Sequence, residues 1–243
     1  MIKNLVESRV APILGAIKST GMPEPQILNA QDLLPRIAPP FITISREAGA
    51  GGLTLAKALV TRLNELQPGQ RAWQSFDREL IEKIAADHKI AQELIASLVD
   101  SSHNWLTEFF SGLSLRDDPT PSEVRVFHSI AATVRALAQA GRVVMVGCGA
   151  GFITGNMPGG IHIRLVAEWD FRVRYMARLL NISQEKAARE VHHRDTNRTA
   201  FFKRFFPDTP LDPERFTMTL KSSSLTEDQM VSAIVAVLST RPA

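Results

Sequence analysis

Residues 41–60 read Phe41-Ile-Thr-Ile-Ser-Arg-Glu-Ala-Gly-Ala-Gly-Gly-Leu-Thr-Leu-Ala-Lys-Ala-Leu-Val60, and they decide the fold. A short apolar run, typical of a buried strand, is followed by a glycine-rich bend and then by a helical pattern. Gly49, Gly51 and Gly52 allow positive φ angles, so successive amide groups of the bend can point at one anion. The N-terminal end of the next helix adds to this attraction. The stretch predicts a phosphate-binding turn, with a glycine-rich turn that holds no ligand as the alternative.

The bend departs from the full P-loop signature at two positions. That signature reads G-x-x-x-x-G-K-[ST]. When Gly49-Ala50-Gly51 is aligned with its second half, Gly52 stands where the lysine belongs. Thr54 then lies one place beyond the usual hydroxyl. The sequence therefore supports nucleotide binding more directly than it supports catalysis.

The composition indicates a globular protein with a local anion site. The chain has 243 residues, is 44% hydrophobic and carries 28 Lys and Arg against 25 Asp and Glu. This small basic excess is spread along the chain, whereas a surface that coats nucleic acid needs clustered charge. We therefore expect nucleotides and no nucleic acid as partners.

The single cysteine, Cys148, and the apolar runs limit the location of the protein. One cysteine forms no internal disulfide and no cysteine-based metal site, so we expect a cytoplasmic protein. No apolar run approaches the roughly 20 residues of a membrane span. The adjacent His192 and His193 would point in different directions on a helix, so we predict no protein-held metal.

The first 40 residues are predicted to form a separate segment. Residues 2–18 carry apolar side chains at helical intervals, which predicts an amphipathic helix despite Pro12. Residues 21–40 contain five prolines and read as a connector, so we divide the chain into 1–40 and 41–243. The helix needs a cover: the main body, a second copy in a homo-oligomer, or a membrane surface. Its polar face carries too few basic residues for stable membrane association.

Beyond residue 40, strands and helices alternate. Strands are expected at 41–45, 73–76, 143–147, 161–166 and 216–220. Helices are expected at 53–66, 78–87, 90–99, 123–140, 170–180, 183–202 and 226–238. This order predicts an α/β fold of three layers, with a central parallel sheet of about five strands. Ligands of such folds bind beyond the carboxyl ends of the strands.

Two further strand ends carry candidate residues. Asp77 is placed to cap the helix that follows the second strand, which leaves Arg78 and Lys83 to face an anion. The third strand ends at Gly147 in small residues that let a ligand come close. Cys148 is next in the chain, and we expect it to act as a small apolar residue rather than as a nucleophile.

The densest charge cluster lies at residues 189–198 and continues to Arg204. Arginine suits transferring phosphates because its planar fork donates two hydrogen bonds and stays charged. On a helix, Arg194 and Arg198 share one face, and Asp195 is spaced to orient Arg198. A solvated helix face with ion pairs is the alternative.

These motifs together resemble the cytidylate kinase-like proteins, a branch of the nucleoside monophosphate kinases in the P-loop class. The stretch Ile44-Ser-Arg-Glu-Ala-Gly-Ala-Gly-Gly52 resembles the I-S-R-E-x-G-x-G-G opening of that branch, and Phe76-Asp-Arg-Glu-Leu-Ile81 resembles its D-[KR]-E-L-I step. The strand that ends in Val146-Gly147 and the Asp195-x-x-Arg198 helix, followed by paired aromatics, occur in the same order. The resemblance covers residues 41–238.

The resemblance implies a five-stranded sheet, a helical lid and acceptor-binding insertions. It implies ATP as the donor, with Mg²⁺ carried by the nucleotide. Around the donor phosphates it places Gly49, Ala50, Gly51, Gly52 and Thr54. Its lid candidates are Arg172, Arg178, Arg194 and Arg198. Near the acceptor it places Asp77 and Lys83.

Two departures from the family pattern concern catalysis and specificity. Gly52 removes the P-loop lysine, as in the rest of this branch, so Arg46 is a candidate replacement cation. Where the branch reads G-R after the third strand, and authentic cytidylate kinases read G-R-D, this chain has Gly147-Cys148-Gly149. Losing two hydrogen bonds to charged groups, each about 1.5–3 kcal/mol, would weaken selection of CMP a few hundredfold or more.

Two functions are consistent with the residues. The first is ATP-dependent phosphoryl transfer to a nucleoside monophosphate or a related small phosphate acceptor, with CMP as the named candidate. The second is a nucleotide-binding pseudokinase or sensor with little transferase activity.

Overall fold

The computed structural model describes residues 2–19, 38–87, 121–207 and 212–240, and it contains a five-stranded sheet in which every strand pairing is parallel. The strand order is β2-β3-β1-β4-β5. The strands are β1 Phe41–Arg46, β2 Gln74–Asp77, β3 Val143–Val146, β4 Gly160–Val166 and β5 Met218–Lys221. The predicted parallel sheet of about five strands is confirmed. The strand predicted at 216–220 begins two residues later, because residues 213–215 form a short 3-10 helix.

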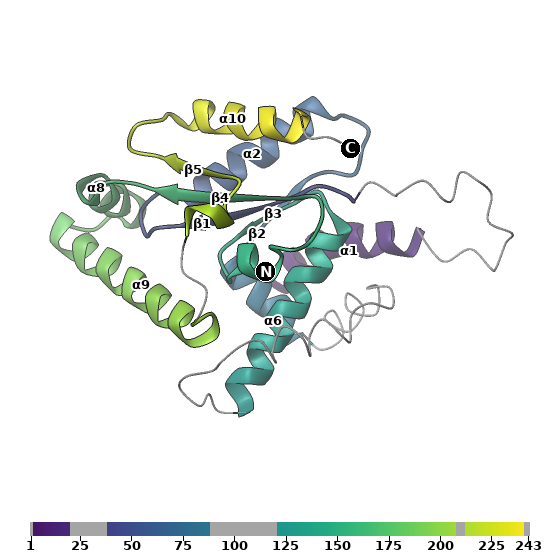
Figure 1. The fold of residues 1–243 in the computed structure, drawn as a ribbon, viewed down its shortest axis with the longest axis horizontal. Coiled ribbons are helices and arrows are strands. Elements are labelled where there is room, and N and C mark those ends of the chain that lie inside the picture. Colours follow the sequence, from purple (N-terminus) through teal and green to yellow (C-terminus); the bar gives the residue numbers. More distant parts are fainter. Residues whose placement is uncertain (1, 20–37, 88–120, 208–211, 241–243) are drawn as a thin grey trace, which may run out of the picture.

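Helices cover both faces of the sheet, which confirms the three layers (Figure 1). One face is covered by α2 (Gly52–Leu66) and α10 (Glu227–Thr240), and the other by α3 (Arg78–Ala86) and α6 (Pro121–Ala140). Between β3 and β4 lies the short α7 (Ala150–Ile153). The helices α8 (Trp169–Leu180) and α9 (Gln184–Phe205) pack on each other beyond the arrowhead of β4 (Figure 1). The helix predicted at 90–99 lies outside the described residues.

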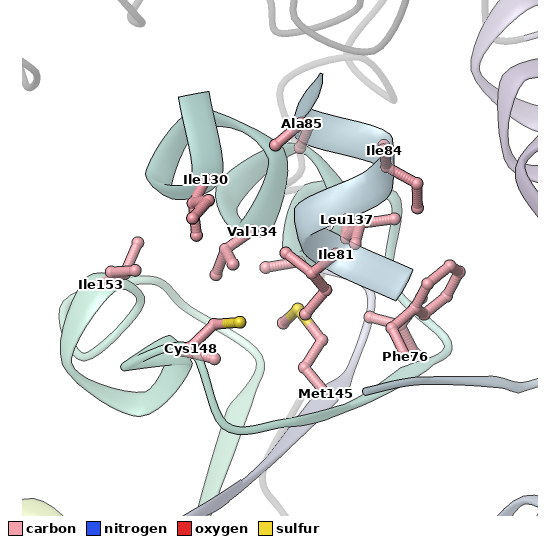
Figure 2. Packing of buried hydrophobic residues seen from close by; sticks show 14 of the residues in the cluster. Phe76, Ile81, Ile84, Ala85, Ile130, Val134, Leu137, Met145, Cys148 and Ile153 are labelled. Atoms are coloured by element: carbon pink, nitrogen blue, oxygen red, sulfur yellow. The ribbon is translucent and has the colours of Figure 1, made fainter. Parts of the chain in front are cut away.

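The apolar strands are explained by burial on both sides. Side chains alternate along β1, so Phe41 packs in the cluster under α3 and α6, whereas Ile42 and Ile44 pack under α2 and α10. Figure 2 shows the first of these clusters, where Met145 of β3 lies beside Ile81 of α3, and Ile84 of α3 and Val134 of α6 belong to the same cluster. Strands buried on both faces read as continuous apolar runs, which is the pattern that the sequence shows.

The register brings three strand ends together. Ile44 of β1 and Asp77 of β2 both pair with Val146 of β3. The chain segments that follow β1, β2 and β3 therefore start at the same edge of the sheet. The chain leads from β1 to β2 on one side of it and from β3 to β4 on the other, and ligands of open parallel sheets bind where the connections change direction in this way.

The N-terminal helix α1 (Ile2–Ser19) packs against α3 and α6. Val6, Val10 and Ile13 are buried in the same cluster as those helices, and the guanidinium of Arg9 donates to the carbonyl of Ser75. A helix lies where the sequence predicts one, and its buried side chains pack against the main body. The homo-oligomer stays a prediction, and the buried residues of α1 already pack within the chain. The boundary at residue 40 also stays a prediction, because most of the connector lies outside the described residues.

Within the described ranges, no helix combines the length and apolarity that crossing a bilayer requires.

Candidate active site

A cavity of about 540 Å³ opens at the carboxyl edge of the sheet. Its walls come from the β1–α2 turn, the start of α3, the β3–α7 turn and the facing sides of α8 and α9. These segments are far apart in the sequence and meet here because of the strand order β2-β3-β1-β4. The cavity is the candidate functional site.

The β1–α2 turn has the backbone conformation that the glycines predicted. Gly49 has φ 77° and Gly51 has φ 83°, and Gly51 is the left-handed N-cap of α2. A Cβ atom on Gly49 would collide with the carbonyl of Arg172, so no side chain fits there. A Cβ atom on Gly51 would lie 3.7 Å from the ring of Tyr175, at ordinary contact distance, but its positive φ strains any L residue.

The amides of this turn are divided between protein and solvent. The Ala48 amide donates to Asp195 Oδ1 at 3.0 Å, and the Ala50 amide donates to the Glu47 carbonyl at 3.2 Å. Within the described residues, the amides of Gly49, Gly51 and Gly52 have no protein acceptor. The first amides of a helix lack intrahelical partners, so they are donors for an anion. The turn therefore has the unpaired donors that a phosphate cradle needs.

The side chain of Arg46, the last residue of β1, lies over Gly52 and Gly147. Its Cγ atom would lie 3.0 Å from a Cβ atom on Gly52, and its guanidinium would collide with a Cβ atom on Gly147. Among the described residues, the side chain of Arg46 has no hydrogen-bond or ion-pair partner. Burial, together with Arg198 and other nearby arginines, lowers the pKa of Arg46 to about 10. Arg46 is still charged near neutral pH, and the absent side chains at Gly52 and Gly147 make room for it.

Three more arginines line the cavity, and each has a carboxylate partner. Arg78 Nε lies 2.6 Å from Glu82 Oε1, Arg194 Nε lies 2.5 Å from Glu190 Oε1, and Arg198 pairs with Asp195. Arg46 is the arginine of this group without such a partner in the described part of the chain. The cavity thus combines unpaired backbone donors with Arg46, a guanidinium that has no carboxylate partner among the described residues, which suits a polyanion.

Two of the predicted site residues line the cavity and also form hydrogen bonds within the protein. Asp77 is the N-cap of α3, and its Oδ1 accepts from the Leu80 amide at 2.9 Å. The hydroxyl of Thr54 lies 2.5 Å from the hydroxyl of Tyr175 on α8. Both residues therefore have local contacts that account for their positions.

Four predicted site residues lie outside the cavity lining. Arg172 lies behind the turn, 11% exposed, with Nε donating to the Ala167 carbonyl at 3.1 Å and Nη1 to the Ala48 carbonyl at 3.3 Å. Lys83 pairs with Glu79 on the surface of α3, Ala50 is buried, and Arg178 is exposed in the last turn of α8. Direct ligand contacts of these four residues stay predictions.

Several cavity residues were not predicted from the sequence. They include Glu47, Lys57, Glu79, Glu82, Tyr175, Asn197, Phe201 and Phe202. Tyr175 lies three residues from both Arg172 and Arg178. Residues three apart share a helix face, so this spacing could have placed Tyr175 beside the predicted lid arginines. The paired aromatics after Arg198 were noted as a motif but not assigned to the site. No sequence signal links Lys57 to the cavity, because its position depends on how α2 packs.

Cys148 is an inert part of the core. Its side chain is buried, and Figure 2 shows it among Ile130, Val134 and Ile153. Burial raises the pKa of Cys148 to about 12, so the thiolate is scarce at neutral pH. This environment supports the expectation that Cys148 is a small apolar residue rather than a nucleophile.

The residues present fit a nucleotide better than they fit a protein-held metal. Unpaired amides and Arg46 match the oxygens of a triphosphate. In the part of the chain that the structure describes, no three His, Cys, Asp or Glu side chains form a metal cluster. Leu53 occupies the place of the usual P-loop hydroxyl. A magnesium ion would therefore be held chiefly by phosphate oxygens, and Glu47 and Asp77 are carboxylates that line the cavity at the ends of β1 and β2.

Comparison with solved structures supports the fold. An uncharacterized protein from Eubacterium ventriosum is 18% identical, with a TM-score of 0.57 over 83% of this chain and 99% of that one. A shikimate kinase from Bacteroides thetaiotaomicron is 16% identical, with a TM-score of 0.46 over 82% of this chain and 98% of that one. At 18% identity, the first of these two similarities bears on the fold alone. No curated protein matches the sequence.

The family comparison covers the body of the protein. Residues 41–224 match the model of the cytidylate kinase-like family. The match includes the glycine turn, α3, the β3–α7 turn and the arginines of α8 and α9, so every wall of the cavity lies within it. The chain belongs to the cytidylate kinase-like family.

Proposed function

We propose that this protein catalyses ATP-dependent transfer of a phosphoryl group to a nucleoside monophosphate or a related small phosphate acceptor, with CMP as the first candidate. One observation carries the proposal: the unpaired amides of Gly49, Gly51 and Gly52 and the guanidinium of Arg46 lie at one cavity. Membership of the cytidylate kinase-like family supports the same reaction class.

The donor phosphates bind in the β1–α2 turn in this proposal. Gly49, Gly51 and Gly52 supply amide donors, and the N-terminus of α2 adds its partial positive charge. Arg46 takes the place of the missing lysine, since its stem lies where a side chain at Gly52 would be. Arg194 and Arg198 stabilise charge on the transferring group from the opposite wall. Such a transfer depends mainly on alignment and cationic stabilisation.

Mg²⁺ bound to the nucleotide would supply charge neutralisation between the donor phosphates.

The acceptor binds between α3 and the β3–α7 turn. Arg78 and Asp77 line that side, and the guanidinium of Arg46 reaches over Gly147 at the end of β3. The family arginine that follows this glycine is replaced by Cys148, so Arg46 and Arg78 are the cations placed to meet an acceptor phosphate there. A phosphate ester therefore suits this wall better than an uncharged acceptor does. The apolar side chains of Phe201 and Phe202 complete it.

The second candidate is a nucleotide-binding pseudokinase or sensor. It is favoured by Gly52 in place of the lysine and by Cys148-Gly149 in place of the family's acceptor-binding residues. In that case the cavity would bind ATP but transfer nothing. A cytoplasmic location stays a prediction under either function.

The test is an ADP-release assay of the purified full chain with ATP, Mg²⁺ and each common nucleoside monophosphate in turn. Binding of ATP is measured separately by calorimetry. Turnover with at least one monophosphate is the expected result. Normal ATP binding without turnover on any acceptor would assign the protein to the second candidate, and absence of both would remove the nucleotide site.

A further inference from the structure

The carboxylate of Asp195 joins three segments that are distant in the sequence. Its Oδ1 accepts from the Ala48 amide at 3.0 Å, in the turn between β1 and α2. Its Oδ2 lies 2.5 Å from Arg172 Nη1 on α8, and the same carboxylate pairs with Arg198 on its own helix α9. One side chain therefore links the glycine turn, both helices beyond the sheet and a cavity arginine.

Asp195 offsets positive charge that is crowded around it. Arg172 also approaches Glu47, at 3.6 Å, and Arg164 interacts with both carboxylates, so three guanidinium groups face two carboxylates. Burial alone would raise the pKa of Asp195, but the hydrogen bonds from the Ala48 amide, Arg172 and Arg198 lower it. Without Asp195, Arg198 would have no counter-charge beside Arg46, whose own pKa Arg198 already lowers.

Asp195 does not itself line the cavity, whereas Arg198 and the turn that it holds do. The bond to Ala48 also fixes the amide that precedes Gly49. All of these atoms belong to the protein, so the contact between α9 and the glycine turn needs no nucleotide to form. This differs from a helix that approaches the turn only when a ligand bridges them.

We propose that Asp195 is a positioning residue: it anchors the phosphate-binding turn through the Ala48 amide and holds Arg198 toward the reacting groups, with Arg172 completing the link. The anchoring is a property of the protein alone, and only its catalytic consequence rests on the proposed function. In this arrangement α9 is docked on the turn before substrates bind.

The anchoring part is tested by amide hydrogen exchange of the full chain without nucleotide, followed by NMR. The Ala48 amide of Asp195→Ala should exchange at least about tenfold faster than in the wild type, because its acceptor is gone. The matched control is Glu185→Ala on the same helix, where the exposed pair with Arg189 makes no contact with the turn. Equal exchange at Ala48 in Asp195→Ala and the wild type would overturn the anchoring.

Asp195→Asn is the second variant if Asp195→Ala does not fold. It keeps an oxygen acceptor for Ala48 but removes the charge that faces Arg198. Protection of Ala48 should stay within about threefold of the wild type, while kcat falls by at least about fivefold. Unchanged kcat together with raised acceptor KM would make Asp195 a substrate contact and overturn the positioning role.

The orienting part is tested by a double-mutant cycle in kcat with Arg198→Ala. If Asp195 acts through Arg198, adding Asp195→Ala to Arg198→Ala should cost less than about twofold. Independent, multiplicative losses would overturn this half of the proposal. If the wild type proves unable to transfer phosphate, the exchange experiment still stands, so failure of the proposed function and failure of the anchoring give different results.

Discussion

The turns after β1 and β3 are built alike and serve the cavity differently. The two strands are parallel neighbours, and each turn contains left-handed residues: Gly49 and Gly51 in the first, and Gly147, Cys148 and Gly149 in the second. Both turns also contain amides without protein acceptors in the described ranges. Yet the first leads into the 15-residue α2, whereas the second leads into α7, which has 4 residues.

The difference lies in what packs on each turn. A Cβ atom on Gly51 would lie 3.7 Å from the nearest atom of Tyr175, so space remains above the first turn. A Cβ atom on Gly149 would lie 2.8 Å from Phe206, and one on Gly147 would meet the guanidinium of Arg46. Both turns line the cavity, but open space remains above Gly51 in the first, whereas the guanidinium of Arg46 and the ring of Phe206 lie close over the second. Left-handed geometry at the edge of a sheet is therefore insufficient to define an anion site, since the covering residues decide it.

The strongest way to break this comparison is Arg46→Ala, which removes the side chain that spans both turns. We expect kcat/KM to fall by about two to three orders of magnitude, the range found when a preorganised group that stabilises transition-state charge is deleted. Because Arg46 has no ion pair among the described residues, the melting temperature should not fall. Steady-state kinetics and calorimetry of Arg46→Ala and the control Arg46→Lys measure both effects. Activity within threefold of the wild type would remove Arg46 from the site.

Gly51→Val tests the first turn directly. The variant forces a β-branched residue into φ 83°, and such strain costs about 1–3 kcal/mol. The added methyl groups also enter the space between the turn and Tyr175, so ATP affinity should fall at least about tenfold. Calorimetric titration with ATP is the measurement. Normal ATP binding by a folded Gly51→Val protein would count against the cradle.

Gly149→Ala is the matching change in the second turn. Its Cβ atom would press on Phe206 and Phe201, and overpacking of this kind costs about 1–3 kcal/mol. The expected result is a lower melting temperature with ATP affinity within about twofold of the wild type. A drop in ATP affinity as large as that of Gly51→Val would show that the two turns are not functionally distinct.

Tyr175→Phe sharpens the description of the space above the first turn. It removes the hydroxyl that lies 2.5 Å from the Thr54 hydroxyl and keeps the ring over Gly51. A partly exposed hydrogen bond contributes about 0.5–1.5 kcal/mol, so ATP affinity should change by less than about tenfold. Titration of Tyr175→Phe beside Tyr175→Ala separates the hydroxyl from the ring, and equal effects of the two changes would contradict a role for the ring.

Lys83→Ala should have the smallest effect. Lys83 pairs with the exposed Glu79 on the surface of α3 and does not line the cavity. Exposed pairs of this kind contribute little. We expect kcat/KM to stay within about twofold for every acceptor tested. A clear rise in acceptor KM would restore the substrate contact that the sequence predicted for Lys83.

Most of the fold could be predicted from the sequence because its signals are local. The strands read as apolar runs since both of their faces are buried, and α2 reads as a helix since Leu55, Leu59 and Leu63 recur at its core face. The left-handed conformations of Gly49 and Gly51 follow from glycine chemistry in the same way. Asp77 was predicted as a cap for the equally local reason that its side chain reaches the amide of Leu80.

Which residues line the cavity depended instead on packing between segments that are distant in the sequence. Arg172 of α8 and Arg198 of α9 were both lid candidates, yet Arg172 lies behind the turn and donates to the Ala48 and Ala167 carbonyls, whereas Arg198 lines the cavity. Arg46 lies over Gly147 only because β3 is inserted beside β1 in the sheet. Periodicity and turn chemistry act over a few residues and so are written in the chain itself. Which guanidinium is balanced by a carboxylate and which faces the cavity depends on strand order and helix docking, which no local pattern encodes.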